Sequence, residues 1–168
     1  KRSNGSYATH EKERTHGGYA RIPHAEKGQV LKLSKNFSLK ELTYSQTAIR
    51  NGISNLPNEE QLVNLTALCQ RVRQPVRDKY GVISVSSGLR AEALNTLIGG
   101  SKTSDHCHGR AADFEVKSEE VSNIELAKYI KDNLEFKQLI LEFYNKDEGP
   151  NSGWVHCSFD AGGDNKGE

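Results

Sequence analysis

The order of hydrophobic and polar positions predicts one long helix near the middle of the chain. In residues 55–81, NLPNEEQLVNLTALCQRVRQPVRDKYG, apolar side chains recur at the three- and four-residue spacing of one buried helix face. These side chains are Leu62, Leu65, Cys69, Val72 and Val76. Pro57 suits the first turn of this helix, Pro75 should kink or interrupt it, and Gly81 lies where it should end.

Four shorter segments have the composition and alternation of β-strands, and they span residues 82–87, 111–116, 138–144 and 153–159. Segments 90–100 and 122–134 have helical patterns, and Ser38 can cap a short helix that begins at Leu39. This mixture predicts an α+β fold, in which a small antiparallel sheet is flanked by helices on one side.

Residues 1–33 show neither the helical spacing nor the strand alternation of hydrophobic residues, and they are rich in Gly, His and charged residues. We therefore expect a disordered leader or linker over 1–33, a folded domain over 34–160 and a flexible tail over 161–168. No run of 18 apolar residues and no apolar N-terminal signal segment occur. These patterns predict no membrane span, no association with membranes, and synthesis in the cytoplasm.

The charge distribution argues against nucleic acid as the main partner. The net charge is +1, and residues 1–30 hold six Lys and Arg against three Glu, which leaves 17 basic and 19 acidic residues for the rest. The basic excess therefore lies on the leader. A nucleic-acid-binding domain that uses this leader stays open as one hypothesis. It predicts salt-sensitive binding that disappears when residues 1–33 are deleted.

The stretch SKTSDHCHGRAADFEV, residues 101–116, concentrates candidate metal ligands. It contains His106, His108 and Asp113, and the predicted strand GWVHCSF adds His156. Because side chains alternate between the two faces of a strand, Asp113 and His156 should each lie opposite the apolar face of their strand. Together with His106 they make a set of three protein ligands that leaves a fourth position for water, which is the pattern of a catalytic zinc site.

The spacing alone leaves alternatives open. Two histidines and an aspartate can occur at these separations by chance, without any metal. Cys107 and Cys157 each follow a candidate ligand and could bind metal themselves, although Cys157 should point away from His156 and Cys107 suits a small buried position. His108 is expected to be exposed or to lie behind the ligands. The odd count of three cysteines, with Cys69, fits a reducing compartment better than a disulfide framework.

Three segments, in this order and at these separations, resemble the zinc D-alanyl-D-alanine carboxypeptidase family of the Hedgehog/DD-peptidase superfamily. They are SSGLR (86–90), IGGSKTSDHCHGRAADF (98–114) and GWVHCSF (153–159), and the similarity extends over residues 34–160. The short phage and prophage branch is the most similar. The family pattern is Ser-x-His, then Gly, Ala and Asp, with a distal Trp-x-His.

The resemblance implies roles for individual residues. His106, Asp113 and His156 match the zinc ligands, and Arg90 matches the arginine that holds the substrate's carboxylate or polarises the reacting carbonyl. A surface ion pair is the alternative role for Arg90. Two further residues, Ser104 and Trp154, match positions near the substrate, and Gly109 and Ala112 match small residues that let the backbone pass close to the metal.

The general base is where the sequence departs from the pattern. Many relatives carry an acidic residue three positions before the last histidine, but here that position is Gly153. We predict that Glu142, within an apolar strand, takes this role because burial raises the pKa of a carboxyl group. The alternative for Glu142 is a partly solvated edge position, and Asp147 and Glu148 are weaker candidates in a polar turn.

The leading hypothesis is therefore a monomeric zinc metallopeptidase that cleaves peptidoglycan stem peptides, as a carboxypeptidase or an endopeptidase. It would be made in a host cytoplasm and would act on the cell wall, as phage lysins do. The alternative is a non-catalytic zinc domain that binds the cell wall or a protein, which the missing acid at Gly153 favours.

Overall fold

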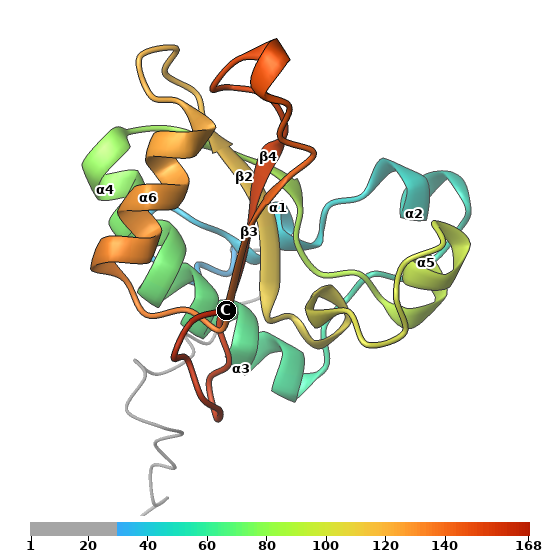
Figure 1. Cartoon of the computed structure of the whole chain (residues 1–168). Helices are drawn as coiled ribbons and strands as arrows, with labels where there is room; N and C mark the ends of the chain where they lie inside the picture. Colours follow the sequence, from blue (N-terminus) through green and yellow to red (C-terminus); the bar gives the residue numbers. More distant parts are fainter. Residues whose placement is uncertain (1–29) are drawn as a thin grey trace, which may run out of the picture.

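A four-stranded antiparallel sheet organises residues 30–168, the part of the chain that the computed structural model describes (Figure 1). The strands are β1 (Ile83–Ser87), β2 (Ala111–Val116), β3 (Gln138–Glu142) and β4 (Trp154–Ser158). They lie in the order β1-β2-β4-β3, so β2 and β4 are central. The predicted α+β class and the four predicted strands are confirmed.

The pairing of β2 with β4 decides which side chains share a face. Asp113 pairs with His156, and Phe114 pairs with Val155. Because paired residues lie on the same face, one face carries the polar pair and the other carries the apolar pair. Phe114 and Val155 are fully buried, as predicted for the core face.

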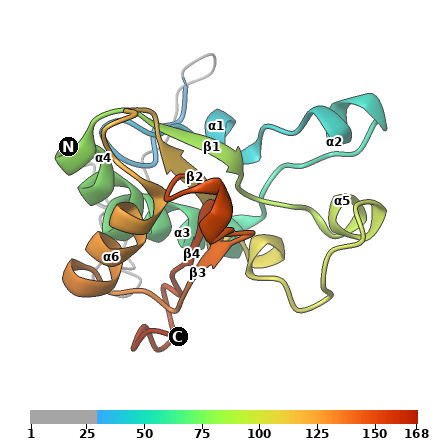
Figure 2. The same cartoon turned by 45° about the horizontal axis from the view of Figure 1, so that its top comes forward.

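Helices cover the core face of this sheet. The helical elements are α1 (Leu39–Thr43), α2 (Gln46–Arg50), α3 (Glu59–Leu68), a π-helical segment (Cys69–Arg73), α4 (Gln74–Tyr80), α5 (Glu92–Leu97), α6 (Asn123–Asn133), and short 3-10 helices at Asp105–His108 and Lys146–Glu148. In Figures 1 and 2, α3, α4 and α6 lie together against the sheet, whereas α2 and α5 form a separate arm on the opposite side of the molecule. None of the described helices is long and apolar enough to cross a membrane.

The long helix follows the predicted pattern with two differences. Asn58 and Gln61 form a capping box at its start, so Pro57 precedes the cap and does not belong to the first turn. The interruption predicted from Pro75 takes the form of a π-helical segment at Cys69–Arg73, which ends two residues before the proline that lacks an N–H group. Gly81, with a φ of 83°, ends the helix as predicted.

The folded part extends beyond the predicted limits of 34 and 160. Leu33 is buried in the core, and its N–H donates to the carbonyl of Phe37. At the other end, the backbone of Glu168 exchanges hydrogen bonds with Lys137 and Leu139. The side-chain amide of Gln70 also donates to the carbonyl of Leu33, 37 positions away, so both end segments are tied to distant parts of the chain. Residues 1–29 of the predicted leader lie outside the described residues.

Candidate metal centre

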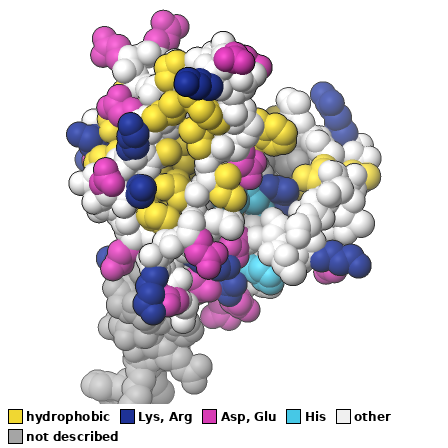
Figure 3. All heavy atoms as spheres, viewed as in Figure 1, with side chains coloured by type: hydrophobic (Ala, Val, Ile, Leu, Met, Phe, Trp, Pro, Cys, Tyr) yellow, Lys and Arg dark blue, Asp and Glu magenta, His cyan; other side chains and the backbone are white. Residues whose placement is uncertain are grey.

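Three side chains from separate elements meet on the polar face of the sheet. His106 comes from the 3-10 helix Asp105–His108, Asp113 from β2 and His156 from β4. One ligand atom from each lies within 4.8 Å of the others, and the residues are only 2%, 7% and 6% exposed. Figure 3 shows histidine, basic and acidic side chains meeting in a hollow between the sheet and the arm that carries α2 and α5.

The ring of His106 is oriented by a backbone carbonyl. Its Nδ1 lies 2.7 Å from the carbonyl oxygen of Gly88, so Nδ1 donates the hydrogen bond and Nε2 keeps its lone pair. Nε2 is buried, has no hydrogen-bond partner within residues 30–168 and lies 3.3 Å from Asp113 Oδ1. Gly88 is required here because a Cβ would overlap the backbone of Leu42.

Asp113 is held as a carboxylate. Its Oδ1 lies 2.8 Å from His156 Nδ1, and its Oδ2 lies 3.7 Å from the guanidinium of Arg90. Burial by itself would raise the pKa of this carboxyl group, but its close contacts with His106 and His156 outweigh that effect and hold the pKa well below its usual range. Asp113 is therefore ionised, as a metal ligand must be.

These observations fit a metal ion bound by nitrogen and oxygen. A buried imidazole nitrogen without a partner, an ionised carboxylate and a second imidazole lie close enough to bind one ion. Two His and one carboxylate are a donor set that zinc takes in catalytic sites. His108 does not belong to the cluster, since its side chain is exposed as predicted.

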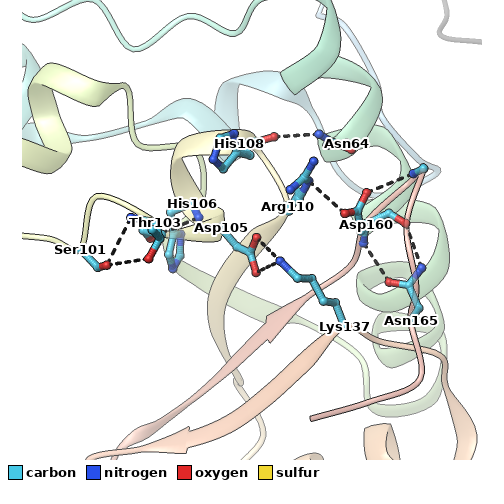
Figure 4. Close-up of polar contacts among 12 residues, drawn as sticks. Asn64, Ser101, Thr103, Asp105, His106, His108, Arg110, Lys137, Asp160 and Asn165 are labelled. Atoms are coloured by element: carbon cyan, nitrogen blue, oxygen red, sulfur yellow. Dashed lines mark hydrogen bonds and ion pairs between the residues drawn. The ribbon is translucent and has the colours of Figure 1, made fainter.

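Polar contacts to helix α3 fix the turn that carries His106. Ser104 caps the 3-10 helix, its Oγ accepting from His106 N at 3.3 Å. Amide groups of Gln61 and Asn64 donate to the carbonyls of Cys107 and His108, and Figure 4 shows the second of these contacts. Gly109 has a φ of 69° and lies against the backbone of Gln61. Its small size is thus needed for the approach to α3 and not, as we had predicted, for the approach to the metal site.

Ala112 also has a different role from the predicted one. It pairs with Cys157, and both are fully buried on the core face, away from Asp113. Burial raises the pKa of the Cys157 thiol, so this side chain is a neutral part of the core. Cys107 is only partly buried, which corrects the predicted buried position, and the three cysteines are free.

A salt bridge that the sequence did not predict joins this turn to the residue before β3. Lys137 Nζ lies 2.6 and 2.9 Å from the two carboxylate oxygens of Asp105, the residue before His106 (Figure 4). The Asp105 side chain is only 10% exposed. The two residues are 32 positions apart and no local pattern connects them, so only the fold brings them together.

Replacing Lys137 with methionine is expected to weaken zinc binding by about tenfold or more, as loss of outer-shell partners does. The Asp105 carboxylate would lose its partner and the His106 turn would lose its tie to β3. Competition with a chromophoric chelator measures the affinity. Lys166→Met is the control, because the Lys166–Asp164 pair is exposed and lies outside the His106 turn. Equal affinities for both variants would contradict this role.

The remaining predicted site residues lie around the cluster. The N–H of Arg90 donates to the carbonyl of His106, and its Nε is buried without a hydrogen-bond partner in the described structure. Glu142 pairs with Trp154, and Ile140 pairs with His156. Glu142 therefore lies on the metal face, diagonal to His156, at the end of β3 and half-buried. The sequence predicts a Glu142 carboxylate buried within an apolar strand, and the structure corrects this: the side chain is half-buried at the strand's end.

The structure leaves no room for an acidic side chain at position 153, which glycine occupies. Its φ is 70°, and a Cβ would overlap the carbonyl oxygen of Glu142. We expect Gly153→Ala to lower the free energy of unfolding by at least about 3 kcal/mol, because it adds a clash to left-handed strain. Urea unfolding measures this change.

Gly52→Ala is the matched control for that substitution. Gly52 has a φ of 62°, but no atom lies within 4 Å of the place that a Cβ would take, so alanine there should cost only about 1 kcal/mol of left-handed strain. The same cost at both positions would mean that the close approach of Gly153 to Glu142 is unimportant.

Comparison with known proteins gives a match to one family. A family model described as Peptidase M15 matches residues 35–158, which is more than half of the chain. The matched region contains the three residues of the cluster as well as Arg90 and Glu142. No curated protein matches the chain.

Proposed function

The chain belongs to the peptidase M15 family, and we propose that it hydrolyses peptide bonds in the stem peptides of bacterial peptidoglycan. M15 peptidases are zinc-dependent metallopeptidases. The observation that carries the proposal is the buried His106–Asp113–His156 cluster, in which His106 Nε2 is directed at the carboxylate and has no hydrogen-bond partner among the described residues. A zinc ion held there would supply an acidified water and a Lewis acid for the scissile carbonyl.

Glu142 is the residue we assign to proton transfer. Diagonal neighbours on adjacent antiparallel strands are about 7–8 Å apart, which leaves room for a water between the Glu142 carboxylate and the cluster. The carboxylate would take a proton from the attacking water and pass it to the amine nitrogen as the C–N bond breaks. In the described structure this carboxylate has no salt bridge that would compete for the role.

Arg90 is the residue we assign to substrate anchoring. Its side chain is 19% exposed, and its backbone is fixed to the turn of His106. A guanidinium at this place can bind a terminal carboxylate through two parallel hydrogen bonds, or it can bind the oxygen of the reacting carbonyl. Ser104 and Trp154 are the other proposed substrate contacts.

The wider role follows the resemblance to phage and prophage enzymes. We propose a monomer that acts on the cell wall like a phage lysin, as a D-Ala-D-Ala carboxypeptidase or as an endopeptidase within the stem. The second candidate is a non-catalytic zinc domain that binds the cell wall or a protein partner. The sequence feature that favours it is the absence of an acidic residue at position 153.

Digestion of purified peptidoglycan, with mass spectrometry of the released fragments, tests the proposal. Release of a single alanine that stops in chelator would establish a carboxypeptidase, and release of larger peptides would establish an endopeptidase. If protein shown to carry zinc releases nothing but sediments with the wall, the non-catalytic domain replaces the enzyme.

A further inference from the structure

An exposed aromatic side chain next to the metal centre is held in an uncommon backbone conformation. Phe143 follows β3 directly, and its φ of 52° is the only positive value of a non-glycine residue within residues 30–168. Bulky side chains rarely adopt the left-handed region, and strained residues of this kind cluster at functional sites. The side chain is nevertheless 78% exposed, so burial in the core does not account for its position.

The strained bend places the ring of Phe143 on Trp154. Their ring centroids are 5.0 Å apart, with an angle of 32° between the planes. The indole Nε1 of Trp154 is buried and makes no hydrogen bond in the described structure, so packing alone positions this ring. Gly153 permits the arrangement, because any side chain there would strike the backbone of Glu142 and Phe143.

These two rings, which we call the aromatic shelf, continue the metal face of the sheet. Trp154 is two residues before His156 on β4 and pairs with Glu142, while Ile140, 38% exposed, pairs with His156. In Figure 3, hydrophobic side chains gather on the sheet side of the hollow that contains the charged groups. An extended peptide whose carbonyl reached the metal centre would therefore pass along an apolar wall.

We infer that Phe143 is a specificity-determining residue, and that the aromatic shelf binds the aliphatic part of the peptide residue next to the scissile bond. This inference rests on the proposed function. A large exposed ring presents a face to C–H groups at a low cost in side-chain entropy, because only two torsions are fixed. Glu142 pairs with Trp154 of the shelf, and Arg90 lies 3.7 Å from Asp113 in the cluster. An apolar contact on the shelf would therefore select side chains without competing for these charged groups.

The chain contains a single tryptophan, so its fluorescence reports directly on the shelf. The probe is the sugar-free stem pentapeptide L-Ala-γ-D-Glu-L-Lys-D-Ala-D-Ala, titrated into the zinc-loaded protein. We expect a saturable change in Trp154 emission, and a Kd about tenfold higher for Phe143→Gly than for the unmodified chain. KM should rise by a similar factor, while kcat and zinc content stay nearly unchanged.

Glycine is the informative replacement because it removes the ring and also relieves the strain. Phe143→Gly should therefore unfold at the same or a higher urea concentration, so that weak binding cannot be ascribed to misfolding. Phe143→Tyr keeps the ring and should bind like the unmodified chain. Val82→Ala is the matched control, since Val82 is 55% exposed and precedes β1, the strand at the far edge of the sheet from β3.

The outcomes separate this inference from the proposed function. Hydrolysis of the pentapeptide without any change in Trp154 emission, or a Kd within twofold for Phe143→Gly, would overturn the shelf and leave the peptidase. A saturable emission change that Phe143→Gly weakens, without hydrolysis, would support the shelf and overturn the peptidase. If the pentapeptide is neither bound nor cleaved, both proposals fail.

Discussion

His106→Ala is expected to remove the bound zinc and to lower kcat/KM by far more than the 10–100-fold that loss of an outer-shell partner causes. The ring of His106 is 2% exposed, its Nδ1 is occupied by Gly88, and its Nε2 faces the cluster without a hydrogen-bond partner in the described structure. Alanine would leave two ligands for an ion that needs three from the protein in a catalytic site. Metal analysis after dialysis and initial rates on peptidoglycan measure the two effects.

His108→Ala is the matched control for this substitution. His108 lies on the same 3-10 helix, but its side chain is exposed and it contributes only its backbone carbonyl, to Asn64. The variant should keep its zinc and its activity. If His106→Ala keeps stoichiometric zinc, the assignment of the metal centre is wrong.

Glu142→Gln is expected to lower kcat by about 10²–10⁴-fold, the usual contribution of a general base, with zinc content unchanged. The amide has nearly the shape of the carboxylate but cannot accept the proton of the attacking water. Glu142 lies diagonal to His156 on the metal face, so the effect should appear in kcat and hardly in zinc affinity. Single-turnover hydrolysis of the stem pentapeptide measures the chemical step.

The control for Glu142 is Glu148→Gln, in the exposed turn Lys146–Glu148. This turn carries the two acidic residues that are the weaker candidates by sequence. Full activity of Glu142→Gln would show that Glu142 is not the base. Loss of activity in Glu148→Gln instead would assign the role to the turn.

Much of the candidate metal centre could be predicted because two of its three residues lie on strands. Alternation along β2 and β4 places Asp113 and His156 opposite Phe114 and Val155, and the structure pairs the residues of each face with one another. This prediction needs only the period of two and the apolar neighbours. The buried face of the long helix was also predictable, from the three- and four-residue spacing of its apolar side chains. Its residues Leu65, Cys69, Val72 and Val76 are fully buried.

The bend after β3 could not be predicted from the sequence. A phenylalanine gives no local signal for a positive φ, and Gly153 resembles an ordinary turn glycine until its distance to Glu142 is known. From the sequence alone, the absence of an acidic residue at position 153 therefore favours loss of catalytic activity. In the structure it is a steric requirement of the segment that presents Glu142 and Phe143.

Long-range polar contacts could also not be predicted from the sequence. The pairing of Lys137 with Asp105 and the contacts of Gln61 and Asn64 depend on how the His106 turn docks on α3 and β3. Such contacts follow from tertiary packing, which no local period encodes. The same reason applies to Leu33, whose carbonyl accepts a hydrogen bond from the side-chain amide of Gln70, 37 positions away.

Diffraction from crystals of the zinc-loaded protein, recorded at the zinc absorption edge, tests the central claim most directly. We predict one strong anomalous peak bonded to His106 Nε2, a carboxylate oxygen of Asp113 and a ring nitrogen of His156, at distances of about 2.0–2.2 Å. No peak among these three side chains, or zinc bound at another site, would contradict the account.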